Sequence, residues 1–353
     1  MFDSLQSKKE FFKTKFPNYL TENLESLDSK HSRLLETLQQ EDWLDRITEG
    51  SLRNSSIQDD IGAPTCFQDY IHRDGSKMLN GLKFLQHKVR FRKLNSELRG
   101  SIKDDISIMK YLNYEKILVE NPVTKSPGKP SYAKIDGYFV NNRWMRYLYL
   151  ASRIIDTQVL PDRGVWVDIG SYYGGLQGIL FKYKPETKIV LVDFHHQLFR
   201  SYAYLSSIYP NATHNLGIEA VLKSSEIGSL NYVHVSDFHD LKDLEVTLVT
   251  NFFSFGEMKR STFNDYVQSD VVKNSQNLYF VNRFVSAPFF EPTYDSDLSV
   301  IDYDFPDFRL VSLDVFPIHH FNLLNRSLFG ILRFRNTSSS YFEGIWKQAS
   351  GRS

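Results

Sequence analysis

The stretch VWVDIGSYYGGLQG, residues 165–178, joins an apolar segment to a glycine-rich turn. Its valine, tryptophan and isoleucine residues favour a buried strand that ends at Gly170. Gly170, Gly174 and Gly175 then provide positions without a Cβ atom, where the backbone can approach a ligand or a neighbouring helix closely. Such a turn can bind a phosphate or an adenosyl group, or it can only allow the next helix to pack closely.

Short apolar segments alternate with helical patterns after this turn. The expected strands are 164–170, 188–194, 231–237, 245–253 and 277–284. Strands that alternate with helices form parallel sheets, and near-continuous apolar strands are typical of a sheet covered on both faces. Two later segments, 308–318 and 328–336, are separated only by a loop, so we expect them to pair antiparallel. The sequence predicts a doubly wound α/β sheet of five parallel strands plus a terminal antiparallel hairpin.

The chain before the sheet has a different pattern. Apolar residues spaced by three and four predict an α-helical N-terminal region, residues 1–120, with helices at 11–27, 31–47 and 78–98. Three prolines and two glycines make 121–140 a linker or a substrate-facing loop. A helix at 141–158 leads into the main domain, 141–340, and 341–353 is expected to be a C-terminal tail.

Composition limits the classes of function. Lys and Arg total 42 and Asp and Glu total 42, so no net charge attracts nucleic acid. The single cysteine, Cys66, excludes an intrachain disulfide and a cysteine-based zinc site. No signal peptide or membrane-spanning run is recognised, so a cytoplasmic protein is expected. The basic run 87–94 and the amphipathic start, residues 8–16, could contact a phosphorylated or lipid-linked glycan and, through it, the membrane periphery, although a solvated helix face is the simpler interpretation.

The glycine turn does not match the dinucleotide fingerprint G-x-G-x-x-G. Ser171 and Tyr172 stand where a second glycine would admit a pyrophosphate, so a ligand without one is favoured. Ligands of open α/β sheets bind at the carboxyl ends of the strands, where the strand order reverses. Asp168 lies on the same strand face as Gly170 and could meet a cationic ligand. Asp193 closes the second strand, where ribose hydroxyls are usually held.

These features resemble the bacterial sugar O-methyltransferases, which belong to the class I methyltransferases. The resemblance lies in residues 167–210, VDIGSYYGGLQGILFKYKPETKIVLVDFHHQLFRSYAYLSSIYP, and in residues 250–267, TNFFSFGEMKRSTFNDYV. The loop 120–130 and the helix 143–154 are also similar, so that the resemblance covers roughly residues 118–336. The chain departs from the family at Ser171, where glycine is usual, and at 194–196, where many members have Leu-Pro-Glu.

The resemblance implies S-adenosyl-L-methionine as cofactor. The residues it places around that cofactor are Asp168, Gly170, Ser171 and Gly174 on the methionine–ribose side, Asp193 at the ribose, and Ser236 and Asp237 near the adenine. Asn251 and Glu257 would face an acceptor sugar or glycan, which could be nucleotide- or lipid-linked. A solvated carboxylate is an equal alternative for Asp237, and a helix-capping acid for Glu257. Residues 251–254 lack the proline typical of nucleic-acid amino-methyltransferases, which counts against a nucleic-acid substrate.

Methyl transfer to an alcohol requires a base for the hydroxyl proton, and neutral histidine suits this role near pH 7. We expect His320, then His319, to be this base, ahead of His195 and His196 beside the ribose. For each histidine a surface or packing role is the alternative. The cluster at 234–240, HVSDFHD, could hold a divalent metal, but it lies on the adenine side and is not favoured.

The sequence thus predicts an S-adenosylmethionine-dependent O-methyltransferase that acts on a sugar hydroxyl in surface-polysaccharide or glycoside biosynthesis. Two alternatives stay open. One is an NAD(P)-linked sugar oxidoreductase on a similar sheet. The other is a non-catalytic methyltransferase-fold subunit of a glycan-assembly complex. The oligomeric state is not predicted.

Overall fold

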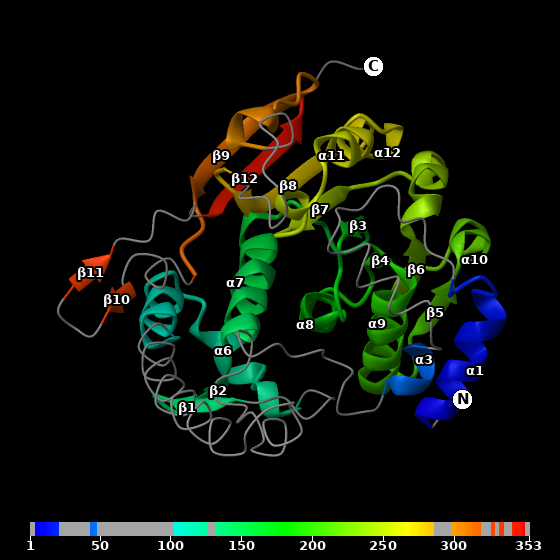
Figure 1. The fold of residues 1–353 in the computed structure, drawn as a ribbon, viewed down its shortest axis with the longest axis horizontal. Helices are drawn as coiled ribbons and strands as arrows, with labels where there is room; N and C mark the ends of the chain where they lie inside the picture. Colours follow the sequence, from blue (N-terminus) through cyan, green and yellow to red (C-terminus); the bar gives the residue numbers. More distant parts are fainter. Residues whose placement is uncertain are drawn as a thin grey trace, which may run out of the picture. The chain divides into compact units, whose positions relative to one another are not determined.

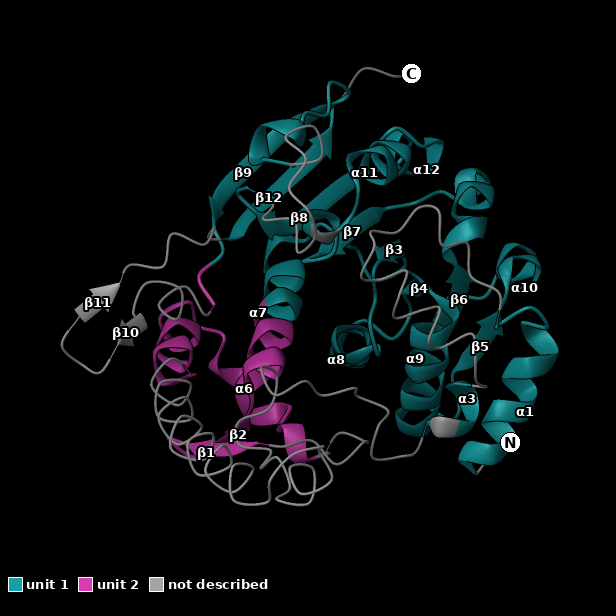
Figure 2. Ribbon diagram, viewed as in Figure 1, with its two compact units in different colours: residues 1–53, 150–316, 337–353 teal, residues 54–149, 317–336 magenta. Residues whose placement is uncertain are grey.

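A computed structural model of the 353-residue chain provides the structure (Figure 1). It describes residues 4–20, 43–47, 102–125, 132–285, 298–318, 326–328, 332–334 and 341–349. The chain divides into two compact units (Figure 2). Unit 1 comprises residues 1–53, 150–316 and 337–353, and unit 2 comprises residues 54–149 and 317–336.

Unit 1 is built on one eight-stranded sheet, in the order β5-β6-β4-β3-β7-β8-β12-β9. The strands from β5 to β8 pair parallel, whereas β12 pairs antiparallel with both β8 and β9. The bounds are β3 (Val165–Ile169), β4 (Lys188–Asp193), β5 (Thr213–Leu216), β6 (Ser229–His234), β7 (Leu248–Phe252), β8 (Asn277–Arg283), β9 (Phe308–Val315) and β12 (Tyr341–Gln348). The predicted Rossmann-like α/β sheet of parallel strands with a terminal antiparallel pair is confirmed.

Both faces of this sheet are covered, which explains the near-continuous apolar strands. Every residue of β4 and β6 is buried. Val167 and Ile169 of β3 belong to an apolar cluster on one face, while Trp166 and Asp168 alternate onto the other and are also buried. Between β3 and β9 the described helices of unit 1 are α8 (Gly175–Tyr183), α9 (His195–Ile208), α10 (Ile218–Lys223), η4 (Val235–Asp243), η5 (Phe255–Glu257), α11 (Arg260–Val267), α12 (Asp270–Lys273) and η6 (Val300–Asp302).

The N-terminal helix α1 (Leu5–Lys15) packs against α9. The Phe12 ring meets the Phe199 ring edge-on at 5.3 Å, and Lys8 donates to the Ser207 hydroxyl at 2.7 Å. The sequence placed this helix at 11–27. It begins earlier and stops before Pro17, because proline clashes with the preceding helical turn. Of the predicted helix at 31–47 the described part contains α3 (Trp43–Arg46), and the helix at 78–98 lies outside the described residues.

The terminal hairpin forms with a different partner from the one expected. The strand that pairs with β9 is β12, from the expected tail, and not residues 328–336. Phe342, Ile345 and Trp346 are almost fully buried, so β12 gains more by lying between β8 and β9 than by remaining a tail. In unit 2, β10 (Arg326–Leu328) pairs with β11 (Leu332–Phe334) in a separate two-stranded sheet.

Two other strand predictions differ from the structure. The short strand β5 was not expected, because its sequence, Thr-His-Asn-Leu, carries little apolar signal. The strand predicted at 231–237 ends at His234, where the His234 side chain accepts the Ser236 backbone N–H and caps the 3-10 helix η4. Ser236 and Asp237 therefore belong to a helical turn and not to a strand end.

The described part of unit 2 comprises helical residues 102–111, α6 (Glu115–Glu120), η3 (Val123–Lys125) and a hairpin of β1 (Ala133–Ile135) and β2 (Tyr138–Val140). Asp136 and Gly137 at the hairpin tip both have positive φ, 49° and 92°, which is typical of a type I′ turn. The helix α7 (Asn142–Thr157) confirms the helix predicted at 141–158, and Asn141 caps it by accepting the Trp144 N–H at 2.8 Å. No helix in the described ranges has the length and apolarity needed to cross a membrane.

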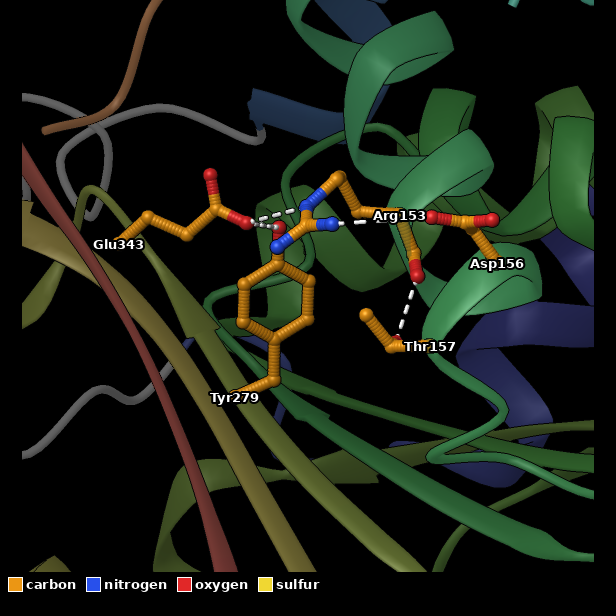
Figure 3. Close-up of polar contacts among 5 residues, drawn as sticks. All are labelled: Arg153, Asp156, Thr157, Tyr279 and Glu343. Carbon is orange, nitrogen blue, oxygen red and sulfur yellow. Dashed lines mark hydrogen bonds and ion pairs between the residues drawn. The ribbon is translucent and has the colours of Figure 1, made fainter. Parts of the chain in front are cut away.

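A buried ion pair ties α7 to the sheet inside unit 1 (Figure 3). Glu343 of β12 is 1% exposed, and its Oε1 accepts from Arg153 Nε at 2.7 Å and from the Tyr279 hydroxyl at 3.0 Å. Arg153 also lies 3.7 Å from the exposed carboxylate of Asp156. The carboxylate is thus compensated by one cation and one neutral donor, as a buried charge requires.

Candidate functional site

The strand order reverses around β3. β4 follows β3 in the chain and lies on one side of it, whereas β7 lies on the other side. Because these strands are parallel, their carboxyl ends meet at one edge of the sheet, the usual ligand position in this class of fold. The segments at this edge are 170–174, 193–194, 234–237 and 251–257.

The glycines of the turn are required by backbone conformation and packing. Gly170 and Gly174 have φ of 81° and 83°, a region that favours glycine. A Cβ atom on Gly170 would collide with the Ser254 hydroxyl, and one on Gly174 would lie 2.9 Å from Leu205 Cδ1 of α9. The turn therefore lies directly against β7 and α9, and its glycines do not by themselves indicate a ligand.

Tyr172 also adopts a positive φ, 55°, which is uncommon for a bulky residue. Two side chains hold it there. Asp193 Oδ2 accepts the Tyr172 N–H at 2.8 Å, and the Ser201 hydroxyl donates to the Tyr172 carbonyl at 2.6 Å. The other carboxylate oxygen of Asp193 accepts the Phe194 N–H at 2.8 Å. Asp193 thus connects the end of β4 to the glycine turn after β3.

Asp168 lies beneath this turn and is 2% exposed. Its carboxylate accepts hydrogen bonds from the Thr250 hydroxyl and from Gln177 Nε2, while Trp166 Nε1 donates to the Thr250 hydroxyl at 2.7 Å. Burial raises the pKa of Asp168 to about 7, although the bond from Thr250 acts against the shift. In the structure the Asp168 carboxylate contacts Thr250 and Gln177, and its expected contact with a cationic ligand stays a prediction.

We expect the Asp168 carboxyl to make stability depend on pH. Because its pKa is raised from 3.8 to about 7, the folded chain keeps a proton that the unfolded chain loses. The free energy of unfolding should therefore fall by up to about 1.4 kcal/mol per pH unit as pH rises from 4 to 7. An Asp168→Asn variant cannot titrate, so its denaturant-derived stability should have a flatter pH profile over this range.

The exposed Asp162, whose pKa is lowered by its hydrogen bond from Lys184, provides a control. Asp162→Asn should leave the slope between pH 4 and 7 unchanged, because this carboxyl titrates below that range. Parallel profiles for the wild type and Asp168→Asn would contradict the assignment of a raised pKa to Asp168.

Two polar atoms near the turn lack hydrogen-bond partners in the structure. Ser171 Oγ and Gln177 Oε1 are both buried, and no group in the described part of the chain pairs with them. An unsatisfied buried polar atom costs roughly 1–3 kcal/mol, so such atoms often mark a binding site. Ser171 was selected from the sequence as a cofactor residue. Gln177 was not, although its place three residues after Gly174, in the first turn of α8, is a usable signal.

The end of β7 is fixed by Asn251, which is 0% exposed. Its Nδ2 donates to the Ile169 carbonyl at 2.9 Å and to the Ser254 hydroxyl at 2.5 Å. Its Oδ1 accepts the Phe255 N–H at 2.9 Å and a hydrogen bond from Asn282 Nδ2 at 3.1 Å. These four bonds use the whole capacity of the amide. Asn251 therefore positions the turn after β7, and its expected contact with an acceptor stays a prediction.

The candidate histidines occupy different environments. His195 is 7% exposed, stacked on the His234 ring at 3.8 Å and edge-on to the Phe16 ring at 5.2 Å, which is a packing role. His196 lies 6.2 Å from the Trp43 ring. His319 and His320 lie outside the described residues, and so does the side chain of Glu257.

The expected adenine-side residues form a local network. The Ser236 hydroxyl lies 2.8 Å from His234 Nδ1 and donates to Asp237 Oδ1 at 2.9 Å. His239 pairs instead with Asp265, with 2.9 Å between His239 Nε2 and Asp265 Oδ2. Within the described ranges, no group of three or more His, Cys, Asp or Glu side chains could hold a metal ion.

A second strained residue was not anticipated from the sequence. Phe253, immediately after β7, has φ of 71°, and its ring meets the Phe316 and Tyr341 rings edge-on at 5.4 and 5.1 Å. Tyr172 and Phe253 thus follow the two strands that flank the reversal of strand order. Strained backbone of this kind concentrates at functional sites. Neither residue carries a sequence signal, because nothing in the chain marks an aromatic residue for a left-handed conformation.

No family model matches the chain, and no curated protein matches it. Solved structures similar to it include the small RNA methyltransferase HEN1, with 13% identity and a TM-score of 0.39 over 64% of this chain, which spans only 28% of HEN1. Magnesium protoporphyrin IX methyltransferase from Synechocystis PCC 6803, with bound SAH, has 9% identity and a TM-score of 0.36 over 58% of this chain and 83% of that one. TrmK from M. capricolum, in complex with SAH, has 12% identity and a TM-score of 0.32 over 57% and 67%. The names of the first two describe methyltransferases that act on different substrates, namely small RNA and magnesium protoporphyrin IX.

Proposed function

We propose that the chain is an S-adenosylmethionine-dependent methyltransferase whose acceptor is a sugar hydroxyl. The observation that carries the proposal is Asp193, a nearly buried carboxylate at the end of β4 that also braces the glycine turn after β3. It lies beside the reversal of strand order, where α/β sheets bind their ligands. A carboxylate accepts several hydrogen bonds, so it is the kind of group that pairs with the two hydroxyls of a ribose.

The residues around the turn fit the amino-acid end of this cofactor. The buried oxygens of Ser171 and Gln177 are acceptors without a donor among the described residues, and an ammonium group supplies donors. We propose that these two residues hold that end, that Asp193 holds the ribose, and that Ser236 and Asp237 lie at the adenine. When bound, the cofactor would supply an activated methyl group on a sulfonium centre.

A nicotinamide dinucleotide is disfavoured by Tyr172. This residue occupies the place of the second glycine of the dinucleotide fingerprint and has the left-handed conformation in which glycine is usual. The backbone thus follows a glycine-like path, but a tyrosine side chain stands where a pyrophosphate would need close access. For this reason we keep the NAD(P)-linked oxidoreductase only as an alternative to be tested.

The sugar acceptor rests on the sequence resemblance and on the missing proline at 251–254. Aromatic residues near the end of β7, Phe252 and Phe253, offer apolar faces of the kind that stack on sugar rings. We propose His320, with His319 second, as the base that takes the hydroxyl proton, an assignment made from sequence alone. Unchanged turnover of both His320→Ala and His319→Ala would move the base elsewhere.

The proposal is tested by incubating the chain with methyl-labelled S-adenosylmethionine and a panel of free, nucleotide-linked and lipid-linked sugars. Label on a sugar oxygen, located by mass spectrometry, is the expected result. Label transferred only to RNA, protein or a small amine would contradict the sugar acceptor and leave the methyltransferase assignment standing. No transfer at all, with the cofactor bound, would favour the non-catalytic subunit.

A further inference from the structure

Among the residues that the structure describes, the strand β9 leaves one edge of the eight-stranded sheet open. It is the last strand in the order and pairs on one side with β12. Four of its eight residues are large, apolar and 43–54% exposed, namely Leu310, Val311, Leu313 and Val315. A long apolar edge strand is a template for pairing with another chain, and proteins usually shorten it, charge it or cover it.

The register with β12 shows how these side chains are distributed. Leu310, Leu313 and Val315 lie opposite Trp346, Gly344 and Phe342 and so share one face of the sheet. On that face Trp346 and Phe342 belong to the main apolar cluster, so the row on β9 extends the core to the sheet edge.

The charged side chains of β9 lie on the opposite face. Arg309 and Asp314 are opposite Lys347 and Glu343, and both are exposed. Arg309 and Asp314 share this face, although they are an odd number of positions apart, because the register with β12 shifts at Val311. This irregularity is a β-bulge, which changes the direction in which the neighbouring side chains point.

The sequence of β9, Phe-Arg-Leu-Val-Ser-Leu-Asp-Val, is complementary to itself in antiparallel register. Centring the pairing between Val311 and Ser312 places Leu310 opposite Leu313 on the apolar face. The same register places Arg309 opposite Asp314 on the other face. A two-fold axis repeats each pair, so that two apolar pairs and two opposite-charge pairs form at once.

We propose that β9 is a homodimer interface, in which two copies of the chain join their sheets edge to edge in antiparallel register around Val311 and Ser312. The partner of β9 is a second copy of the chain, because a two-fold axis places its apolar residues opposite apolar residues and its basic residue opposite its acidic residue. This interface closes after two subunits, since each copy has one such edge within the described residues. It is independent of the cofactor and of the acceptor.

Sedimentation velocity on the full chain tests the interface. The wild type should sediment with twice the chain mass of 41.2 kDa, and Leu313→Glu should sediment as a monomer. Leu222→Glu on α10 is the matched control, because Leu222 is 42% exposed and Leu313 is 43% exposed. This control should remain dimeric, and unchanged circular dichroism should show that both variants fold.

A charge exchange tests the register. Arg309→Asp places like charges opposite each other twice and should weaken the dimer by about tenfold or more. The double variant Arg309→Asp/Asp314→Arg restores opposite charges and should recover the wild-type dissociation constant. A monomeric wild type, larger open assemblies, equal dissociation of Leu222→Glu, or no recovery in the double variant would each overturn the proposal.

Discussion

Replacing Glu343 by alanine should lower the free energy of unfolding by about 3–5 kcal/mol, because it leaves the Arg153 guanidinium without its buried partner. Glu343 is 1% exposed and accepts hydrogen bonds from Arg153 and Tyr279 of unit 1 (Figure 3). Its removal therefore takes an acceptor away from the guanidinium and from the tyrosine hydroxyl. Chemical denaturation followed by circular dichroism measures the change directly.

The control uses the other carboxylate near the same guanidinium. Asp156 lies 3.7 Å from Arg153 and is 59% exposed, so Asp156→Ala should cost no more than about 1 kcal/mol. Replacing both charges by apolar residues, in Arg153→Met/Glu343→Leu, should recover much of the stability lost in Glu343→Ala. Equal losses in Glu343→Ala and Asp156→Ala would show that burial does not set the strength of this pair.

Replacing Asp193 by alanine should weaken the binding of S-adenosylhomocysteine by roughly 10- to 150-fold, which corresponds to about 1.5–3 kcal/mol for hydrogen bonds to a charged group. The substitution also removes the acceptor of the Tyr172 N–H, so the glycine turn loses one of the two bonds that hold its strained residue. Both effects weaken a ligand bound at the turn. Isothermal titration calorimetry gives the dissociation constant.

Asp240→Ala is the control for this change, because Asp240 is an exposed carboxylate in η4, near the same edge of the sheet. Its affinity for S-adenosylhomocysteine should match that of the wild type. If Asp193→Ala also binds with wild-type affinity while remaining folded, Asp193 does not hold the ribose.

The sheet was largely predictable because its strands are short, apolar and separated by helical patterns. Five parallel strands were placed within a few residues of their observed bounds. An antiparallel pair at the end of the sheet was predicted, but the wrong segment was chosen as the partner of β9. The signal for a strand at 328–336 is local, whereas the position of β12 depends on burying Phe342 and Trp346 against β8 and β9. Tertiary burial of this sort overrides local propensity.

The site was predictable at the level of segments and less so at the level of side chains. The glycine turn and Asp193 lie at the expected edge of the sheet. The bonds of Asn251 and Asp168 could not be foreseen, because they depend on register: Thr250 lies opposite Asp168, and Asn251 opposite Ile169. The same alignment makes Asp168 and Asn251 supports for the turns that follow their strands.

The most direct test of the central claim is calorimetric titration of the chain with S-adenosylhomocysteine and, separately, with NAD. The account predicts saturable binding of one S-adenosylhomocysteine per chain and no heat of binding with NAD. Binding of NAD alone, or of neither ligand, by a folded chain would contradict it.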